Sequence, residues 1–254
     1  DLIVPAVEQA LKTAGVEARE LDLVIVSTDT PDYLSPSTAA VVQHRIGATR
    51  AGAFDVNSAC AGFVTALDMA GKYIVADAQY KNILVVGAEV MSRTINPADI
   101  KTYPLFGDGA GAVLLTASKD PSKGLLSYTL GAEGCGGQLL SIPSGGSRLP
   151  LTTAAIDAGE HFLKMEGRSV FKWAVRVVSD SLQDCLTHAR LDIDQIDLMI
   201  LHQANMRIID SAVSDFAFDR DKVFVNLERY GNTSAASIPL ALDEALTSGA
   251  LKPG

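Results

Sequence analysis

Three polar side chains in this sequence have the types and the surroundings of catalytic groups. Cys60 follows a short polar turn, His202 follows an apolar run that ends at Leu201, and Asn232 follows Gly231. A thiolate, an imidazole and an amide donor are sufficient to form a thioester and to stabilise an oxyanion. Taken together, the three residues predict acyl transfer through a cysteine.

Cys60 lies where an apolar stretch of strand type, residues 53–56, turns into a predicted helix. The helix is indicated by apolar residues with helical spacing: Phe63, Leu67, Ala70 and Ile74. Unpaired N–H groups and the positive end of the helix dipole gather at a helix N-terminus and favour a thiolate over a thiol. Small neighbours leave room around the sulfur. We therefore expect Cys60 to be a nucleophile that ionises readily.

Each of the three residues also has an ordinary structural interpretation. A free cysteine is often a small buried residue. A lone histidine at the end of a strand is often structural, because burial shifts its pKa without giving it a function. An asparagine after glycine can serve a turn or a helix cap. Only the combination favours catalysis.

Composition excludes several classes of protein. The chain has 254 residues, of which 48% are hydrophobic, which is enough for a large core in one domain or in two packed halves. A net charge of −9 argues against nucleic acid or an anionic membrane as the main partner. We expect no apolar run near the ~18 residues of a membrane span and no signal peptide. Cys60, Cys135 and Cys185 are too scattered for a disulfide scaffold or a zinc knuckle, so a reducing, cytoplasmic setting is expected.

The remaining pattern alternates between helices and strands. Continuous apolar strands between helices are typical of a sheet that is covered on both faces. Residues 118–157 are rich in Gly, Ser and Pro and predict irregular loops or short strands, and a turn is expected at residues 251–254. The expected helices cover residues 1–15, 36–46 and 166–186, and the expected strands cover residues 21–26, 53–56, 82–87, 112–116 and 196–201.

A glycine-rich run, residues 106–111, resembles a nucleotide-binding loop in composition only. A loop that binds phosphate follows a strand and opens a helix, whereas this run precedes a predicted strand. Close packing of the backbone beneath the site is the expected use of these glycines.

An internal repeat relates the two halves of the chain at one constant offset in the numbering. The strand at residues 21–26 matches residues 196–201, and residues 66–68 match residues 241–243 at the same offset. Two copies of one β/α unit are therefore expected. The repeat places His202 at the end of one strand, and it aligns the start of the Cys60 helix with the segment after Asn232. Matching turns of two packed halves can converge at the carboxyl ends of the strands, where open α/β sheets bind ligands.

Four motifs, in order along the chain, resemble β-ketoacyl-acyl carrier protein synthase III, a family of condensing enzymes that begins bacterial fatty-acid synthesis. They are Ser58-Ala59-Cys60-Ala61-Gly62-Phe63, Phe106-Gly107-Asp108-Gly109-Ala110-Gly111, His202-Gln203-Ala204-Asn205 and Gly231-Asn232-Thr233-Ser234-Ala235-Ala236-Ser237. The resemblance implies an α/β, thiolase-like fold with two repeated halves in α/β/α/β/α layers. The expected boundaries are residues 1–118 for the first half, 119–165 for a connecting region and 166–254 for the second half. We also expect the chain to be truncated at both ends relative to the family.

The resemblance also implies roles for individual residues. Cys60 would accept an acyl group from acyl-CoA, and malonyl-acyl carrier protein would then enter. His202 and Asn232 would stabilise the enolate that decarboxylation leaves, and no metal or redox cofactor would be needed. Phe106 would line the acyl pocket. Five further residues would flank the pantetheine arm of the substrates: Leu105, Gly167, Phe171, Ala174 and Asn205. A homodimer is expected from the same resemblance.

A basic stripe indicates a docking face. Lys164, Arg168, Lys172 and Arg176 recur every four residues of a predicted helix, and Arg207 lies beyond the His202 motif. On an acidic protein such a patch suits an acidic partner or a phosphate-bearing ligand, although a solvated helix face has the same pattern. The resemblance assigns carrier-protein docking to Lys172, Arg207 and Arg168.

Three other functions remain open at this point. A related condensing enzyme of secondary metabolism would use the same three residues on another donor. A cysteine hydrolase can also carry Cys, His and Asn in this order, but the repeat and the missing Cys-Gly-Ser-Cys-Trp signature argue against it. A non-catalytic homologue that only binds a ligand would have an inert Cys60.

Overall fold

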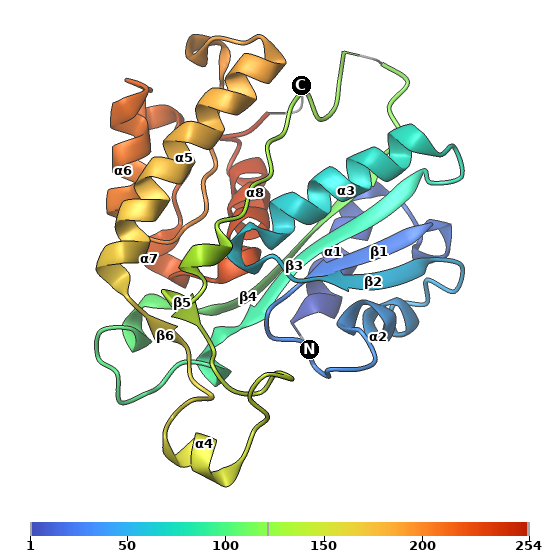
Figure 1. The fold of residues 1–254 in the computed structure, drawn as a ribbon. Helices are drawn as coiled ribbons and strands as arrows, with labels where there is room; N and C mark the ends of the chain where they lie inside the picture. The colour runs from blue at the N-terminus through green and yellow to red at the C-terminus, as the bar shows by residue number, and fades with distance from the viewer. Residues whose placement is uncertain (1, 121, 253–254) are drawn as a thin grey trace.

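A four-stranded sheet in the order β2-β1-β3-β4 organises the first half of the molecule (Figure 1). Its strands are β1 (Leu23–Ser27), β2 (Gly52–Val56), β3 (Asn82–Val90) and β4 (Asp108–Thr116). β1 runs parallel to β2 and β3, whereas β4 is antiparallel to β3. This computed structural model describes residues 2–120 and 122–252. The last two residues of the turn expected at 251–254 therefore lie outside the described part.

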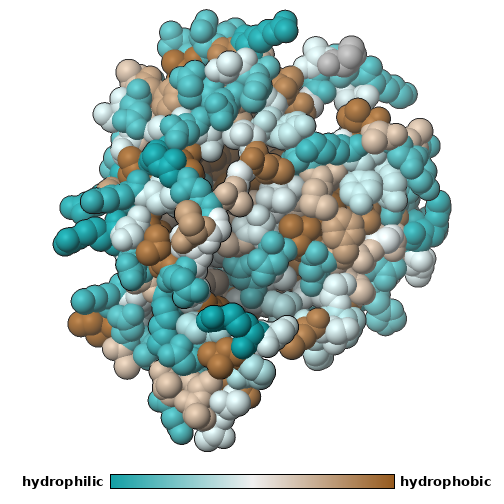
Figure 2. Space-filling model, viewed as in Figure 1, coloured by the Kyte–Doolittle hydropathy of each residue, from teal (hydrophilic) through white to brown (hydrophobic). Residues whose placement is uncertain are grey.

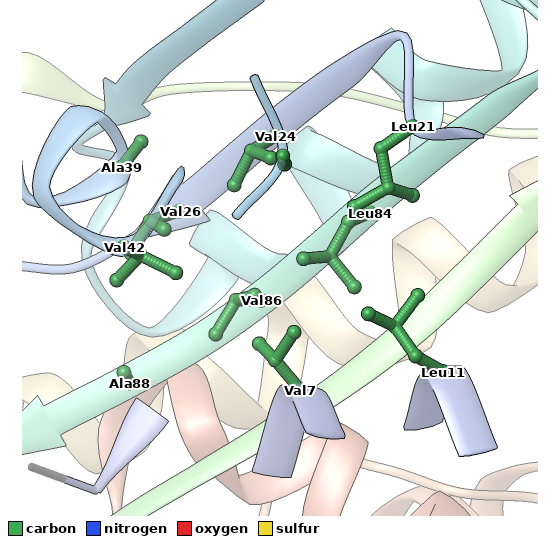
Figure 3. Packing of buried hydrophobic residues seen from close by; sticks show 11 residues of the cluster. Val7, Leu11, Leu21, Val24, Val26, Ala39, Val42, Leu84, Val86 and Ala88 are labelled. Atoms are coloured by element: carbon green, nitrogen blue, oxygen red, sulfur yellow. The ribbon is translucent and has the colours of Figure 1, made fainter. Parts of the chain in front are cut away.

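Helices cover both faces of this sheet, as the continuous apolar strands predict. On one face, α1 (Ile3–Ala14) and α2 (Thr38–Arg45) pack against alternate residues of β1 and β3, including Val24 and Val86 (Figure 3). On the other face, α3 (Gly62–Ala76) packs against the residues between them, including Ile25 and Val85. The C-terminal ends of β1 and β2, where the candidate nucleophile follows, are thereby held from two sides.

The α3 segment corrects the expectation about apolar runs. Ala59–Ala76 has a mean hydropathy of 1.3 over 18 residues, so within the described residues one helix is long and apolar enough to cross a membrane. Its inward side, with Phe63, Ala66 and Ala70, belongs to the core against the sheet. Exposed valines on the outer side of the helix, such as Val75, raise its mean hydropathy further. The helical spacing of the inward apolar residues does not predict these valines.

The second half contributes α5 (Gly167–Ala189), α6 (Met206–Asp215), α7 (Leu227–Tyr230) and α8 (Ser237–Thr247) (Figure 1). The strand expected at residues 196–201 is reduced to one parallel bridge between Met199 and Val223. Met199 makes both of its backbone hydrogen bonds to the 222–224 segment, with N···O distances of 2.8 and 3.0 Å. Among the described residues the pairing does not continue on either side of Met199 and Val223, which leaves an isolated bridge in place of a strand, and the pair packs against α6.

The offset between the two halves recurs in the structure. α1 ends at Ala14 and α5 ends at the equivalent Ala189, and each is followed by a left-handed residue, Gly15 with φ 66° and Arg190 with φ 57°. The 3₁₀ turns η1 (Ala18–Glu20) and η6 (Ile193–Gln195) then follow at the same offset, and both carry a capping box. The two halves are therefore built on one plan.

The glycine-rich run joins the halves. From Asp108 onward it forms the start of β4, so it does not precede the strand as expected. A Cβ at Gly107 would lie 2.0 Å from the Tyr230 carbonyl oxygen, and one at Gly111 would lie 2.9 Å from the Leu240 backbone nitrogen. The predicted close packing of the backbone is thus confirmed, and its partners are α7 and α8.

The region between the halves is mostly irregular, as its composition predicts. It contains β5 (Leu140–Ser141), which pairs with β6 (Lys164–Met165), and the short helix α4 (Thr153–Asp157). The remaining 3₁₀ turns of the described chain are short connections: η2 (Ala59–Ala61), η3 (Met91–Arg93), η4 (Tyr103–Leu105), η5 (Gly134–Gly136), η7 (Arg220–Lys222) and η8 (Ser234–Ala236).

Candidate active site

Cys60 is the central residue of η2, the single turn that connects β2 to α3. It is half-buried and lies directly before the first turn of α3, which is the position that the sequence pattern predicts. The turn depends on Ala59, which has φ 47° in the left-handed region that non-glycine residues rarely adopt. The backbone reversal at Ala59 sets the direction in which Cys60 leaves the strand.

The matching turn of the other half lies beside this one. In η8, Ser234 has φ 48° and corresponds to Ala59, and α8 begins at Ser237, which corresponds to Gly62 at the same offset. The Ser234 hydroxyl donates a hydrogen bond to Cys60 Sγ, with 3.5 Å between the heavy atoms. The second half of the chain therefore supplies the hydroxyl group that contacts the candidate nucleophile in the first half.

Asn232 is buried and held from two sides. Its backbone N–H donates to the Leu105 carbonyl at 2.8 Å, and its carbonyl accepts the Gly107 N–H at 3.0 Å. Its side-chain Oδ1 accepts the Ser234 N–H at 2.9 Å. This bond fixes the amide plane, so the Nδ2 group points away from Ser234 as a donor. Phe106, assigned to the acyl pocket, and Leu105, assigned to the pantetheine arm, are thereby brought next to Asn232.

His202 is oriented by Ser237, the first residue of α8. The Ser237 hydroxyl accepts the Gln203 N–H at 3.3 Å, and its own proton is free to donate to His202 Nδ1, 2.5 Å away. With Ser237 as the donor in this contact, the imidazole proton lies on Nε2, which then acts as a donor. Burial lowers the pKa of His202 to about 4, so the ring is neutral near pH 7.

One segment, residues 232–237, therefore connects the three predicted catalytic residues. Asn232 contacts Ser234, Ser234 contacts Cys60, and Ser237 contacts His202. The sequence motifs assign neither serine a role, although both stand in the quoted motif. The repeat offers a signal for them, because Ser234 and Ser237 align with Ala59 and Gly62 around Cys60.

The electrostatics of Cys60 correct the expectation of a ready thiolate. Burial raises the pKa of the thiol to about 11, and the negative charges of Asp29 and Glu89 act in the same direction. The Ser234 hydrogen bond lowers the pKa but does not outweigh burial. Cys60 does lie directly before α3, as predicted, but the effect of desolvation on its pKa is larger than that of the helix dipole.

The Ser234 contact predicts a change in thiol reactivity. Ser234→Ala keeps the backbone N–H that holds Asn232 and removes the hydroxyl that stabilises the thiolate. Because a hydrogen bond to a charged group contributes about 1.5–3 kcal/mol, we expect alkylation of Cys60 by iodoacetamide at pH 8 to slow about tenfold. Peptide mass spectrometry gives the rate site by site, and the exposed Cys135 serves as an internal reference. Equal slowing at Cys135, or no slowing at Cys60, would contradict the assignment.

The other predicted site residues lie on α5 and at the start of α6. Gly167, Phe171 and Ala174 lie on the first turns of α5. Asn205 caps α6, with its side chain accepting the Arg207 N–H at 2.9 Å. Their contact with substrate stays a prediction. In the described part of the chain, no group of three or more His, Cys, Asp or Glu side chains is placed to hold a metal ion.

The basic stripe is shorter than expected. Lys164 lies in β6, before α5 begins, so only Arg168, Lys172 and Arg176 share the helix. Arg176 forms ion pairs with Glu133 and with Asp180. Arg168, Lys172 and Arg207 are exposed or partly exposed, and hydrophilic side chains predominate on the side of the molecule that carries α5 and α6 (Figure 2).

Comparison with known proteins shows the family to which the chain belongs. A family model for 3-oxoacyl-acyl carrier protein synthase III matches residues 54–134, and the model for its C-terminal part matches residues 186–254. The β-ketoacyl-acyl carrier protein synthase III of Rhodopirellula baltica is 51% identical, over all of this chain and 78% of its own.

Solved structures agree in fold. The crystal structure of 3-oxoacyl-acyl carrier protein synthase III from Aquifex aeolicus matches 99% of this chain and 76% of its own, with a TM-score of 0.89 and 40% identity. The priming β-ketosynthase of the R1128 polyketide pathway matches 99% of this chain and 74% of its own, with a TM-score of 0.88 and 37% identity. The chain therefore belongs to the 3-oxoacyl-acyl carrier protein synthase III family, the condensing acyltransferases that begin fatty-acid synthesis.

Proposed function

We propose that Cys60 accepts the acyl group of an acyl-CoA and passes it to malonyl-acyl carrier protein with loss of carbon dioxide. The observation that carries this proposal is the link from Asn232 through Ser234 to Cys60, which joins the thiol to an oriented amide donor. Family membership decides against a cysteine hydrolase and a non-catalytic binding protein.

The first half-reaction is thioester exchange at Cys60. The Cys60 sulfur attacks the acyl-CoA carbonyl carbon, and the bond from that carbon to the CoA sulfur breaks. CoA leaves as a thiol with the proton that Cys60 gives up. Because the resting thiol has a raised pKa, the proton has to leave as the new bond forms, and the Ser234 hydroxyl stabilises the thiolate character of the sulfur meanwhile.

The second half-reaction takes place against His202 and Asn232. The bond between the malonyl C2 carbon and its carboxylate breaks, and the electron pair moves into the thioester as an enolate. His202 Nε2–H and Asn232 Nδ2–H donate to the enolate oxygen, which is the position of greatest new charge. The C2 carbon then attacks the acyl-Cys60 carbonyl, and the collapse of that adduct releases the β-ketoacyl product and the Cys60 thiolate.

Intact mass spectrometry tests the covalent step. The enzyme is mixed with a panel of acyl-CoAs beside Cys60→Ala, and we expect one acyl adduct on the wild type and none on the variant. An adduct of equal yield on Cys60→Ala would contradict the role of Cys60. If acyl-CoAs leave the wild type unmodified while an acyl-acyl carrier protein labels it, the donor is the carrier protein, as a specialised pathway would require.

The partners follow from this proposal. Arg168 and Lys172 on α5 and Arg207 on α6 are exposed positive charges, which suits docking of an acidic partner, and we assign the carrier protein to them. The residues that would flank the pantetheine arm lie beside them on α5 and α6: Gly167, Phe171, Ala174 and Asn205. We further propose that the enzyme works as a homodimer in the cytoplasm and needs no cofactor besides its acyl-CoA substrate.

A further inference from the structure

The side-chain amide of Gln203, the residue after His202, is buried and has no part in the proposed reaction. Gln203 is 1% exposed. Its Nε2 group donates to the carbonyls of Leu201 at 2.8 Å and Phe224 at 3.5 Å, and its Oε1 accepts the Asn226 N–H at 3.1 Å. A buried amide is costly unless its polar atoms are hydrogen-bonded, and here the donor and the acceptor both have partners.

These hydrogen bonds continue a strand pair that the backbone leaves unfinished. Met199 pairs with Val223, and within residues 122–252 that pairing extends no further. A side-chain amide carries the same kinds of donor and acceptor as a peptide group. Gln203 therefore supplies the hydrogen bonds that a longer strand would make, and it holds the segment with His202 against residues 224–226.

Asn226 is in turn anchored by Glu244 of α8. The Glu244 carboxylate accepts the Asn226 Nδ2–H at 2.9 Å, an Arg229 guanidinium N–H at 2.7 Å and the Tyr230 hydroxyl at 2.5 Å. Asn226 lies directly before α7 and Tyr230 ends it. One carboxylate thus holds both ends of the short helix that leads to Asn232.

The helix α8 also supports His202 directly. Ser237, in its first turn, contacts His202 Nδ1, and Glu244 lies about two turns later on the same side of the helix. Asn232 is fixed separately, by backbone hydrogen bonds to the segment just before β4. The position of His202 relative to Asn232 therefore depends on α8 and on the hydrogen bonds of Gln203.

We propose that Gln203 is a positioning residue, which holds His202 where its Nε2–H and the Nδ2–H of Asn232 reach the same enolate oxygen. This rests on the proposed function of His202 and Asn232. Both amide protons of Gln203 are directed at backbone carbonyls, so its side chain acts through His202 and not on the substrate. Misplacing a reacting group by about 1 Å can slow a reaction ~100-fold.

Gln203→Met tests the amide, because methionine is also unbranched and lacks the hydrogen-bonding groups. We expect decarboxylation of malonyl-acyl carrier protein to slow about 10- to 100-fold in kcat, with KM within about twofold of wild type. Acylation of Cys60 should stay within about threefold, because Cys60 contacts Ser234 and not Gln203. Release of carbon dioxide and quenched intact mass follow the two half-reactions. Lower stability alone would reduce both of them equally.

Gln43→Met is the matched control. The Gln43 side chain on α2 donates to the Ala48 carbonyl, on the face of the sheet opposite α3. This variant also loses an amide hydrogen bond to the backbone, but neither half-reaction should change.

Glu244 gives a second test nearer the surface, since its side chain is 21% exposed. Glu244→Ala removes the anchor of α7 and of Asn226, so decarboxylation should slow about tenfold while acylation is retained. Glu244→Gln keeps an oxygen that accepts the Asn226 Nδ2–H, and it should decarboxylate within about threefold of wild type.

Decarboxylation by Gln203→Met at the wild-type rate would overturn the inference, and so would an equal loss of acylation and decarboxylation in that variant. If Gln203→Met does not fold, the Glu244 variants decide. Wild-type decarboxylation in Glu244→Ala, or a loss in Glu244→Gln as large as in Glu244→Ala, would then contradict the positioning role. Undiminished decarboxylation in His202→Ala would instead overturn the proposed function of His202, and the inference with it.

Discussion

His202→Ala is expected to leave acylation of Cys60 within about threefold of wild type and to slow decarboxylation of the malonyl thioester at least ~100-fold. The reason is that the two residues contact different serines. Cys60 is hydrogen-bonded to Ser234, whereas His202 is hydrogen-bonded to Ser237, so loss of the imidazole ring leaves the contacts of Cys60 unchanged. The enolate, in contrast, loses one of its two donors. Intact mass gives the acyl-enzyme, and release of carbon dioxide gives the second half-reaction.

The pH profile gives a second check on His202. Its pKa is lowered to about 4, so the ring stays neutral and keeps its Nε2 proton from pH 8 down to about 5. Decarboxylation by acylated wild type should therefore show no loss from His202 over that range. A requirement for imidazolium would instead give a rate that falls as the pH rises above 4.

His188→Ala is the control, because His188 is an exposed histidine in the last turn of α5. Neither half-reaction should change in it. Equal loss of acylation and decarboxylation in His202→Ala would contradict the division of roles, and would mean that the ring also supports Cys60.

Local patterns were sufficient to predict the elements that carry the site. The apolar runs at β1 and β3 predict strands buried on both faces, because each alternate side chain meets a helix. The constant offset between the halves predicts that η2 and η8 are equivalent turns, and both begin with a left-handed residue, Ala59 and Ser234. The sequence also predicts that Cys60, His202 and Asn232 lie at turns, and their catalytic roles are part of the proposed function.

Non-local contacts explain what the sequence could not predict. The pKa of Cys60 depends on burial and on Asp29 and Glu89, which are remote from it in the sequence. The bridge at Met199 stands in place of a strand because its pairing with Val223, remote in the sequence, does not extend to neighbouring residues. The roles of Ser234 and Ser237 depend on the packing of η8 and α8 against β3 and β4, and no local periodicity records that contact.

This packing makes Gly87→Ala the second change of large expected effect. A Cβ at Gly87 of β3 would lie 2.2 Å from the Ala235 carbonyl oxygen and 3.2 Å from Pro239 Cγ. The nearest atom belongs to the backbone of η8, so no side-chain rotation relieves the clash. We expect a loss of about 3 kcal/mol in the free energy of unfolding, the upper end of the usual cost of overpacking, measured by urea denaturation. Because Ala235 follows Ser234, alkylation of Cys60 should change as well.

Gly71→Ala is the matched control, with the opposite expected sign. Gly71 lies within α3, where a Cβ would meet only the flexible Leu125 Cδ2 at 3.4 Å. Replacing a glycine in a helix interior should stabilise the enzyme by about 0.5–1 kcal/mol. An unchanged free energy of unfolding in Gly87→Ala would mean that η8 can retreat from β3 without loss. Ser234 would then not be held rigidly against Cys60, and the tenfold effect expected for Ser234→Ala should disappear with it.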